Sequence, residues 1–590
     1  MIKDCLEIFE KQYKKFGDAY ILDSYVLGEG TYVLVDKMGE IKQVLEVVKT
    51  KGEPDRTVEG YNTFCLMDYY SKLINMNKAM DIKKVIHSNN YLSFFVKKES
   101  LINGKLTKAI IQDYYYTLGH LEEKYKKPSQ SKLLYETTLE KCGLINQEQL
   151  KQNEQWIQTH IFDLDKTHNI VMDKRYLKIF FESDEEEFKR EGERYFFPNV
   201  FNAAEYNVIL DESIYGIPSN NLGLNAKKPY LKHKTRKNEV PYLVSTEEVM
   251  LQKKFFDYLM NEVCIGHVNL YFSEEEGIKA YLSNELMTFR NSKRQTFTGY
   301  YLRIAKGKEV EIQDAESILQ YRTELEGFKV SRSICIDYSK IEKGIEYGEI
   351  KELKIVMQMV HSRFFNNFMV YFGEPSDKLK SEVIRRSILM SREAFFEWFY
   401  KGNTLAIKSL FPKISRELIK NSIKENQMIR AKEQWMLRDA IIDYLYKGGD
   451  TMSDKMKPIL DRLEEKLKGE EAVLESDAEY FCAVGQVAYY LLSLNKGSKK
   501  THALVNPLLN AKDDIQIKSI LRRLFVKYNY DITQGGKRFR RLYAMVEGYI
   551  PEGKLDEDAL LYGYLQDNLL YKRGEKAVSY THLRAHETLS

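Results

Sequence analysis

The second half of this chain carries a single kind of pattern, and that pattern limits the fold more than any other feature of the sequence. From Lys351 to about Tyr571 the apolar residues recur at helical spacing. Glycine or proline interrupts them at Gly373–Ser376, Gly402, Pro412, Gly448-Gly449, Gly497 and Gly535-Gly536. The first half instead mixes helical runs with short β-type runs. We therefore expect an α+β protein that ends in a helical bundle.

At 590 residues the chain is long enough for about three or four domains of ordinary size. We expect an N-terminal α+β region at 1–222, a mixed central region at 223–350, a helical region at 351–450 and a C-terminal helical bundle at 451–577. The tail, 578–590, resembles translated sequencing-adapter read-through, so we exclude it from fold and function and expect the natural C-terminal residues to be missing here.

Local patterns predict individual elements of the first half. Amphipathic spacing predicts helices at 2–16, 61–75 and 105–127. Three β-type runs, at 20–27, 31–35 and 41–48, predict a meander. A further helix at 245–264 should begin with Ser245 or Thr246 as its N-cap, because glutamates follow directly in its first turn.

The bulk composition excludes some classes of protein. Hydrophobic residues make up 43% of the chain and aromatic residues 13%, which is too much for a disordered protein. The six cysteines never come within four residues of one another, so we expect reduced, mostly buried thiols and no zinc knuckle. No signal peptide opens the chain, and the longest nearly apolar run, Tyr480–Leu494, is too short to span a bilayer. We expect a cytoplasmic protein.

Net charge is only +4, so a nucleic-acid surface requires cations that are locally segregated. The strongest cluster lies in Gly223–Tyr242, where prolines prevent a continuous helix and Glu239 is the one acid. Its cations are Lys227, Lys228, Lys232, Lys234, Arg236 and Lys237. A polyanion gains from such crowding because each neutralised phosphate releases counterions. The alternative is a solvated, lysine-rich loop.

Two more basic clusters follow along the chain. Arg290–Lys308 contains no acid, and its cations include Arg290, Lys293, Arg294 and Arg303. The third cluster comprises Arg522, Arg523, Lys527, Lys537, Arg538, Arg540 and Arg541, with Tyr528, Tyr530 and Phe539 among them. Cations beside aromatic faces suit phosphates beside bases, and three such patches predict an extended groove. For the second cluster the alternative is an exposed strand edge kept soluble by its charges.

One short stretch imitates an active site. Asp163 and Asp165 resemble the first motif of haloacid-dehalogenase-type phosphatases, which need magnesium. The residues before Asp163 are largely polar, whereas that motif follows a buried strand. With His160 and His168 the two aspartates could instead hold a metal, but a polar turn fits the pattern better. We expect no catalytic residues, no metal and no cofactor.

Three stretches resemble the large subunit of the type I-B CRISPR effector complex (Cascade), of the Csh kind. They are Asp81–Leu101, Lys227–Asp257 and Phe481–Pro507, and they follow in the family's order. The resemblance implies a non-catalytic subunit that binds the 5′ end of the guide RNA and the target double-stranded DNA. It also implies contact with other Cascade subunits, help in recognising the motif that flanks the target, and recruitment of a helicase-nuclease. A nucleic-acid-binding protein outside CRISPR is the other alternative.

A reader of a flanking motif needs small polar side chains at a groove, with cations nearby for phosphates. Ser88, Asn89 and Asn90 are the candidates, and Lys83, Lys84, Lys97 and Lys98 flank them. The alternative is that Ser88 or Asn89 caps the N-terminus of a helix.

The resembled family also produces a separate small subunit from the 3′ end of the large-subunit gene. Here Lys447–Met452 can be encoded AAA GGA GGA GAT ACA ATG, which contains a ribosome-binding site, AGGAGG, before a start codon. We therefore predict an internal start at Met452, with Met456 as a less favoured start. The alternative is that Gly448-Gly449 only ends a helix, and both can hold.

Overall fold

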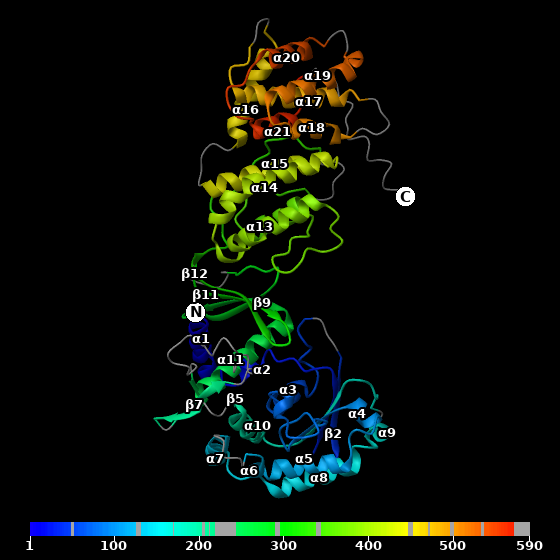
Figure 1. The fold of residues 1–590 in the computed structure, drawn as a ribbon, viewed down its shortest axis with the longest axis vertical. Coiled ribbons are helices and arrows are strands. Elements are labelled where there is room, and N and C mark those ends of the chain that lie inside the picture. Colours follow the sequence, from blue (N-terminus) through cyan, green and yellow to red (C-terminus); the bar gives the residue numbers. More distant parts are fainter. Residues whose placement is uncertain are drawn as a thin grey trace, which may run out of the picture. The chain divides into compact units, whose positions relative to one another are not determined.

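The computed structural model divides the chain into two compact units, each of which we describe by itself (Figure 1). Unit 1 comprises Met1–Glu285 and Thr298–Leu319, and unit 2 comprises Leu286–Phe297 and Gln320–Ser590. Within them the structure describes residues 1–48, 52–125, 131–168, 170–202, 207–211, 213–218, 243–288, 296–337, 344–446, 452–469, 473–495, 501–532 and 536–571. Sheets and helices are mixed in the first part of the chain, and helices dominate the second. The protein is therefore α+β, as expected.

Unit 1 is built on a four-stranded sheet of order β2-β1-β4-β3. Its strands are β1 (Gly30–Val35), β2 (Ile41–Val47), β3 (Ser93–Lys97) and β4 (Tyr176–Phe181). β1 pairs antiparallel with β2 and parallel with β4, and β3 runs antiparallel to β4. Two of the three strands of the predicted meander, those at 31–35 and 41–48, are therefore confirmed, with β1 buried along its whole length.

The strand predicted at 20–27 is wrong. Residues 19–22 form the short helix α2 (Ala19–Leu22), and the backbone after it pairs with no strand among the described residues. The physical reason is aromatic packing, because the Tyr20 ring stacks on that of Tyr258 with centroids 5.2 Å apart. A β-type composition does not distinguish a strand from a segment that places its aromatic residue against a helix.

Besides α2, unit 1 contains ten described α-helices. They are α1 (Ile2–Phe16), α3 (Tyr61–Ser71), α4 (Lys98–Ile102), α5 (Lys108–Gly119), α6 (Leu121–Lys124), α7 (Ser131–Cys142), α8 (Gln147–His160), α9 (Leu164–His168), α10 (Glu185–Asn199) and α11 (Thr246–Ile265). The helices predicted near 2–16, 61–75, 105–127 and 245–264 are confirmed. Ser245 is the N-cap of α11, since its Oγ accepts a hydrogen bond from the Glu248 backbone N–H at 3.2 Å.

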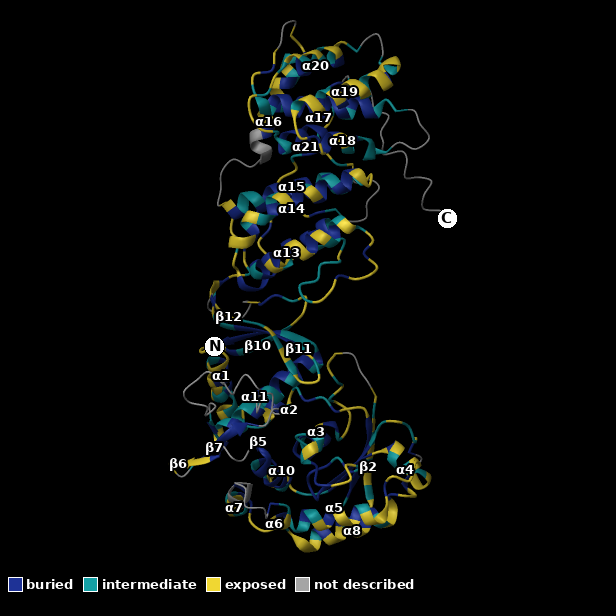
Figure 2. Ribbon diagram, viewed as in Figure 1, coloured by how far each residue is buried: buried dark blue, intermediate teal, exposed yellow. Residues whose placement is uncertain are grey.

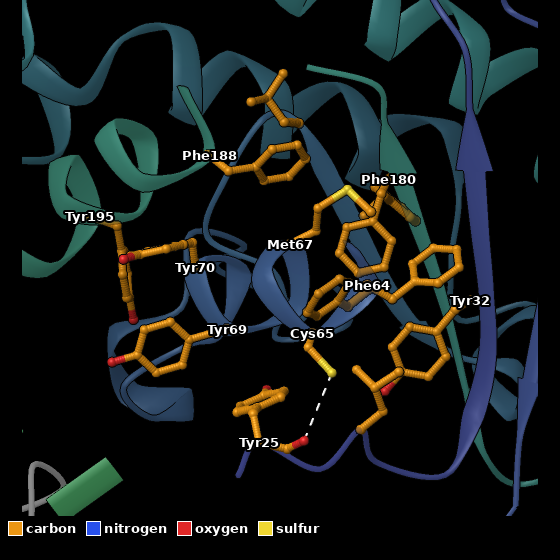
Figure 3. Packing of buried hydrophobic residues seen from close by; sticks show 14 of the residues in the cluster. Tyr25, Tyr32, Phe64, Cys65, Met67, Tyr69, Tyr70, Phe180, Phe188 and Tyr195 are labelled. Carbon is orange, nitrogen blue, oxygen red and sulfur yellow. Dashed lines mark hydrogen bonds between the residues drawn. The ribbon is translucent and has the colours of Figure 1, made fainter. Parts of the chain in front are cut away.

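The core of unit 1 packs aromatic and apolar side chains of α3 against the sheet (Figure 3), and a buried ion pair starts from the same helix. α3 lies against the sheet through Phe64 and Met67, and the Cys65 thiol contacts the Tyr25 carbonyl oxygen at 3.8 Å. On the same helix the buried Asp68 carboxylate accepts hydrogen bonds from Tyr25 Oη and from Lys178 Nζ. Lys178 also lies over the rings of Tyr32 and Phe95. α3 is thereby fixed to β4 by charge as well as by apolar contact.

The cysteines are unpaired, as expected, and most are buried. Burial raises the pKa of the Cys65 thiol to about 12, so it stays protonated at neutral pH. Cys264 is half-buried and Cys335 is exposed.

Two smaller sheets complete the strands of unit 1. The first has the order β10-β9-β11-β12, from β9 (His267–Ser273), β10 (Gly277–Leu282), β11 (Phe297–Lys306) and β12 (Val310–Tyr321). The second contains β5 (Phe201–Asn202), β6 (Val208–Leu210), β7 (Ser213–Pro218) and β8 (Val244–Ser245). The predicted central region at 223–350 therefore contributes most of its described strands to the same unit as the N-terminal sheet.

Among its described residues, unit 2 is mainly helical and includes the short strands β13 (Lys329–Val330) and β14 (Gly348–Glu349). Its longer helices are α12 (Leu353–Phe365), α13 (Glu382–Lys401), α14 (Leu405–Lys424), α15 (Met428–Tyr446), α16 (Met452–Lys466), α17 (Asp477–Ser493), α19 (Asp514–Tyr528), α20 (Lys537–Gly548) and α21 (Glu557–Leu565). The four-residue helix α18 (Asn506–Leu509) lies between α17 and α19. No described helix is both long and apolar enough to cross a membrane.

An ion-pair cluster joins α21 to the helices before Met452. Asp558 is buried, and both of its carboxylate oxygens accept hydrogen bonds from Arg416 at 2.9 Å. Arg438 donates to the same carboxylate at 3.0 Å, and Lys420 pairs with the neighbouring Glu557 at 3.2 Å. Burial alone would raise the pKa of Asp558, but the two arginines hold it below the ordinary aspartate value.

Two glycines allow α17 and α21 to cross in near contact of their backbones. A Cβ on Gly485 would collide with the Leu560 carbonyl oxygen, and one on Gly563 would collide with the Cys482 carbonyl oxygen. Gln486 fixes the same crossing, because its side-chain amide donates to the Gly563 carbonyl at 2.6 Å and accepts from the Leu569 N–H at 2.7 Å. The crossing has no room for any larger residue.

Gly563→Ala should therefore destabilise the protein by roughly 3 kcal/mol, since backbone atoms have to move to admit the methyl group. Gly548→Ala is the matched control, because nothing lies within 4 Å of a Cβ at this helical position. That substitution should leave the protein unchanged or slightly more stable. Thermal unfolding measures both variants, and an equal midpoint for the two would contradict the close crossing.

Candidate nucleic-acid interface

Most of the cations predicted to bind nucleic acid lie outside the residues that the structure describes. This holds for Lys227, Lys228, Lys232, Lys234, Arg236, Lys237, Arg290, Lys293 and Arg294. Their roles stay predictions.

Of the cations named above in the first two basic clusters, Arg303 is the one that the structure describes, and it lies inside the fold. It sits on β11 opposite Asn269 of β9, and 7% of its surface is exposed. Its guanidinium donates to Asn269 Oδ1 at 2.5 Å and to Ser283 Oγ at 3.0 Å. This part of β11 is buried on both faces, so the alternation that marks outward-facing residues is missing from the sequence there.

Ser88, Asn89 and Asn90 are also in the interior, each no more than 2% exposed. The alternative, an N-cap, is wrong, because no helix begins there. Ser88 Oγ accepts from the Phe95 N–H at 3.2 Å, and the side-chain amides of Asn89 and Asn90 donate to backbone carbonyls of Lys72 and Phe188. They bind the segment before β3 to α3 and α10. A role in reading a flanking motif stays a prediction, and it would require this segment to open.

The aspartates of the phosphatase-like motif follow a helix. α8 ends at His160, so Asp163 lies in an exposed turn and the buried strand that such a nucleophile requires is missing before it. Its carboxylate contacts Lys166 Nζ at 3.4 Å. Across the described residues no three His, Cys, Asp or Glu side chains gather in a way that could hold a metal ion.

The third basic cluster is described almost completely, and α19 and α20 place it on one helical hairpin (Figure 1). The two helices lie side by side through stacked aromatic rings. Phe525 of α19 stacks on Tyr543 and Phe539 of α20, with centroids 5.0 and 6.1 Å apart. The sequence grouped these cations by their spacing along the chain, and the hairpin brings them together in space.

The cations of this hairpin divide into two groups. Arg538 donates to the carbonyls of Leu569 and Tyr571, and Arg541 donates to that of Leu467 at 2.7 Å, so both are used within the fold. The others are exposed, and both helices have exposed stretches in Figure 2. We call this exposed group, Arg522, Arg523, Lys527, Lys537 and Arg540, the hairpin patch. Within the described part of the chain, Arg522 is the member that has a carboxylate within ion-pair distance, that of Glu547.

The position of the patch on α20 is electrostatically unfavourable. Four cations stand in the first five residues of this helix, where the helix dipole is positive, and the first turn has no acid. The N-cap, Gly536, supplies no side-chain hydrogen bond. A helix N-terminus favours negative charge, so this arrangement gains free energy when an anion binds.

Two large side chains on or directly after α19 are also exposed. Tyr530, just after α19, and Val526 are each 71% exposed. An exposed aromatic ring between cations can stack on a base while the cations contact phosphates. The hairpin patch and Tyr530 therefore have the two chemical features that single-stranded nucleic acid requires.

Comparison with known protein families, with curated proteins and with solved structures found no match to this chain.

A matched pair of substitutions separates the two groups of cations. Arg538→Gln should lower the free energy of unfolding by about 1–2 kcal/mol, because it removes bonds to two backbone carbonyls. Arg540→Gln removes the same charge but relieves repulsion with the helix dipole, so stability should stay equal or rise by about 0.3–1 kcal/mol. Chemical denaturation measures both, and the reverse order would contradict the assignment.

Proposed function

We propose that this chain is a non-catalytic, nucleic-acid-binding subunit of a cytoplasmic complex. The observation that carries the proposal is the hairpin patch, in which four exposed cations lack a carboxylate partner within the described residues, together with the exposed Tyr530 that follows α19. A folded protein gains little from such a surface, whereas a polyanion binds it with release of counterions.

The patch would act on the backbone of the nucleic acid and not on its sequence. Lys527, Lys537 and Arg540 would contact phosphates, and Tyr530 would stack on an unpaired base. These contacts do not distinguish one base pair from another, so the patch would hold a strand wherever another component had selected it.

The resemblance to the type I-B Cascade large subunit suggests what that component is. In such a complex, pairing between guide RNA and target DNA selects the sequence, while the protein holds the backbone. The partners would be the guide RNA, target double-stranded DNA, the other Cascade subunits and a helicase-nuclease. Of the three stretches that carry the resemblance, the first contains β3 and the second contains the first part of α11. The third runs from within α17 to the start of α18.

Two alternatives remain open. A phosphatase using Asp163 and Asp165 is disfavoured by the helix before them, and metal-dependent phosphatase activity that disappears in Asp163→Asn would restore it. A nucleic-acid-binding protein outside CRISPR shares the same patch. The neighbouring genes separate that alternative, since genes for Cascade backbone and nuclease subunits should lie beside this one.

Replacing Lys527, Lys537 and Arg540 together by Gln should weaken nucleic-acid binding equally for oligonucleotides of unrelated sequence. The slope of log affinity against log salt should become shallower by roughly 2–3, because up to three phosphate contacts are lost. Fluorescence anisotropy over a salt series measures this. The matched control replaces the exposed lysines Lys378, Lys380 and Lys413 of the same unit. Equal losses in both variants would contradict a defined patch.

The internal start predicts a second, smaller product. α16 begins at Met452, so a product that started there would begin with this helix. In a gene that encodes Gly448-Gly449 as GGA GGA, synonymous recoding to GGT GGT should abolish the small product and leave the full-length chain unchanged. An immunoblot against a C-terminal epitope measures both. A small product that survives recoding but disappears in Met456→Leu would move the start to Met456.

A further inference from the structure

Glu547 occupies a special position at the hairpin patch. It lies in the last turn of α20, and its carboxylate is the one within ion-pair distance of the patch among the residues that the structure describes. The basic cluster is recognised in the sequence by its run of cations, and Glu547 falls six residues after the last of them. Only the hairpin brings it back to α19.

The contact between Glu547 and Arg522 is bidentate. Arg522 Nη2 donates to Glu547 Oε2 at 2.6 Å, and Arg522 Nε lies 3.2 and 3.1 Å from the two carboxylate oxygens. The arginine side chain is 64% exposed and that of the glutamate 21%. Arg522 is thus a surface cation whose charge is already paired with a carboxylate and whose Nε and Nη2 donors are already used.

The electrostatics of Glu547 keep this contact in place. Partial burial alone would raise the pKa of Glu547, but hydrogen bonds from Arg522 and Tyr543 hold it below the ordinary glutamate value. The carboxylate therefore stays ionised at neutral pH, and a phosphate that approached Arg522 would also approach a negative charge.

The fold does not depend on this ion pair. Exposed ion pairs contribute little to stability. The packing of α19 on α20 is instead provided by stacked rings, including Phe525, Phe539 and Tyr543. The same carboxylate reduces the net charge of a surface that is otherwise suited to a polyanion.

We propose that Glu547 limits the affinity of the hairpin patch for nucleic acid by withholding Arg522 from phosphates. This inference rests on the proposed function and adds how the same site is regulated. A patch limited in this way binds a strand and also releases it quickly, which suits a protein that holds nucleic acid only while another component acts on it.

Glu547→Gln tests this in the full-length protein, because the amide keeps the shape of the side chain and loses the charge. The probes are a fluorescein-labelled oligothymidylate of about 20 nucleotides, a site size that a surface of this kind can cover, and a labelled duplex of equal length. We expect tighter binding, slower dissociation and a salt slope steeper by about 0.7–0.9, the value of one additional phosphate contact. Thermal unfolding shows whether the variant is intact.

The decisive comparison is with Arg522. In an Arg522→Gln background, Glu547→Gln should produce much less steepening of the slope, because the released cation is missing. Glu374→Gln is the charge-matched control, since it removes an exposed acid from a loop of the same unit, and it should leave the slope unchanged.

Three outcomes separate the two proposals. If the unmodified protein binds neither probe, the proposed function fails. If it binds, but Glu547→Gln leaves the salt slope unchanged, the role of Glu547 is overturned while the proposed function stands. Equal steepening in Glu374→Gln, or full steepening without Arg522, would reduce the effect to net charge and also overturn it.

Discussion

A buried charge must have a partner, and this requirement organises the chain from its core to its surface. Asp68 has none of its surface exposed, and ordinary burial would raise its pKa. Lys178 and Lys72 instead hold the pKa of Asp68 below the aspartate value, so the carboxylate stays ionised and binds α3 to β4. An unpaired ion in that place would cost several kcal/mol. Asp558 meets the same requirement in unit 2 through two arginines.

The same requirement decides which cations remain available for a ligand. Arg303, Arg538 and Arg541 look alike in the sequence, where each is one cation in a basic run. In the fold their donors are directed at Asn269 and at backbone carbonyls, so these side chains hold the protein together. Within the described part of the chain, no hydrogen bond or ion pair engages the side chains of Lys527, Lys537 or Arg540, and all three are exposed. A basic run therefore overstates the size of a nucleic-acid surface, and the structure identifies the members that can serve it.

The sequence predicted the helices and the fold class well because amphipathic periodicity and capping are local signals. Ser245 is an example, since the cap and the helix it begins lie within a few residues. The sequence predicted local structure less well wherever a contact with a residue distant in the chain determines it. Tyr20 packs against Tyr258 instead of joining a strand, and Asn90 is fixed by the backbone of Phe188. No local pattern could show those partners, and none could show that Glu547 returns to Arg522.

The crossing of α17 and α21 has a consequence for how the C-terminal part of the chain can exist. Gly485 and Gly563 both lie after Met452, so a polypeptide that began there would carry the two halves of the contact. The close crossing of α17 and α21 would then form within that polypeptide alone. What it would leave behind are Arg416 and Arg438, and Asp558 would then lose the two arginines that now neutralise it. The two forms of this segment would share one interior and differ where α21 meets α14 and α15, since the Asp558 carboxylate is neutralised there in one form and uncompensated in the other. A single gene could in that way supply two components with distinct binding preferences.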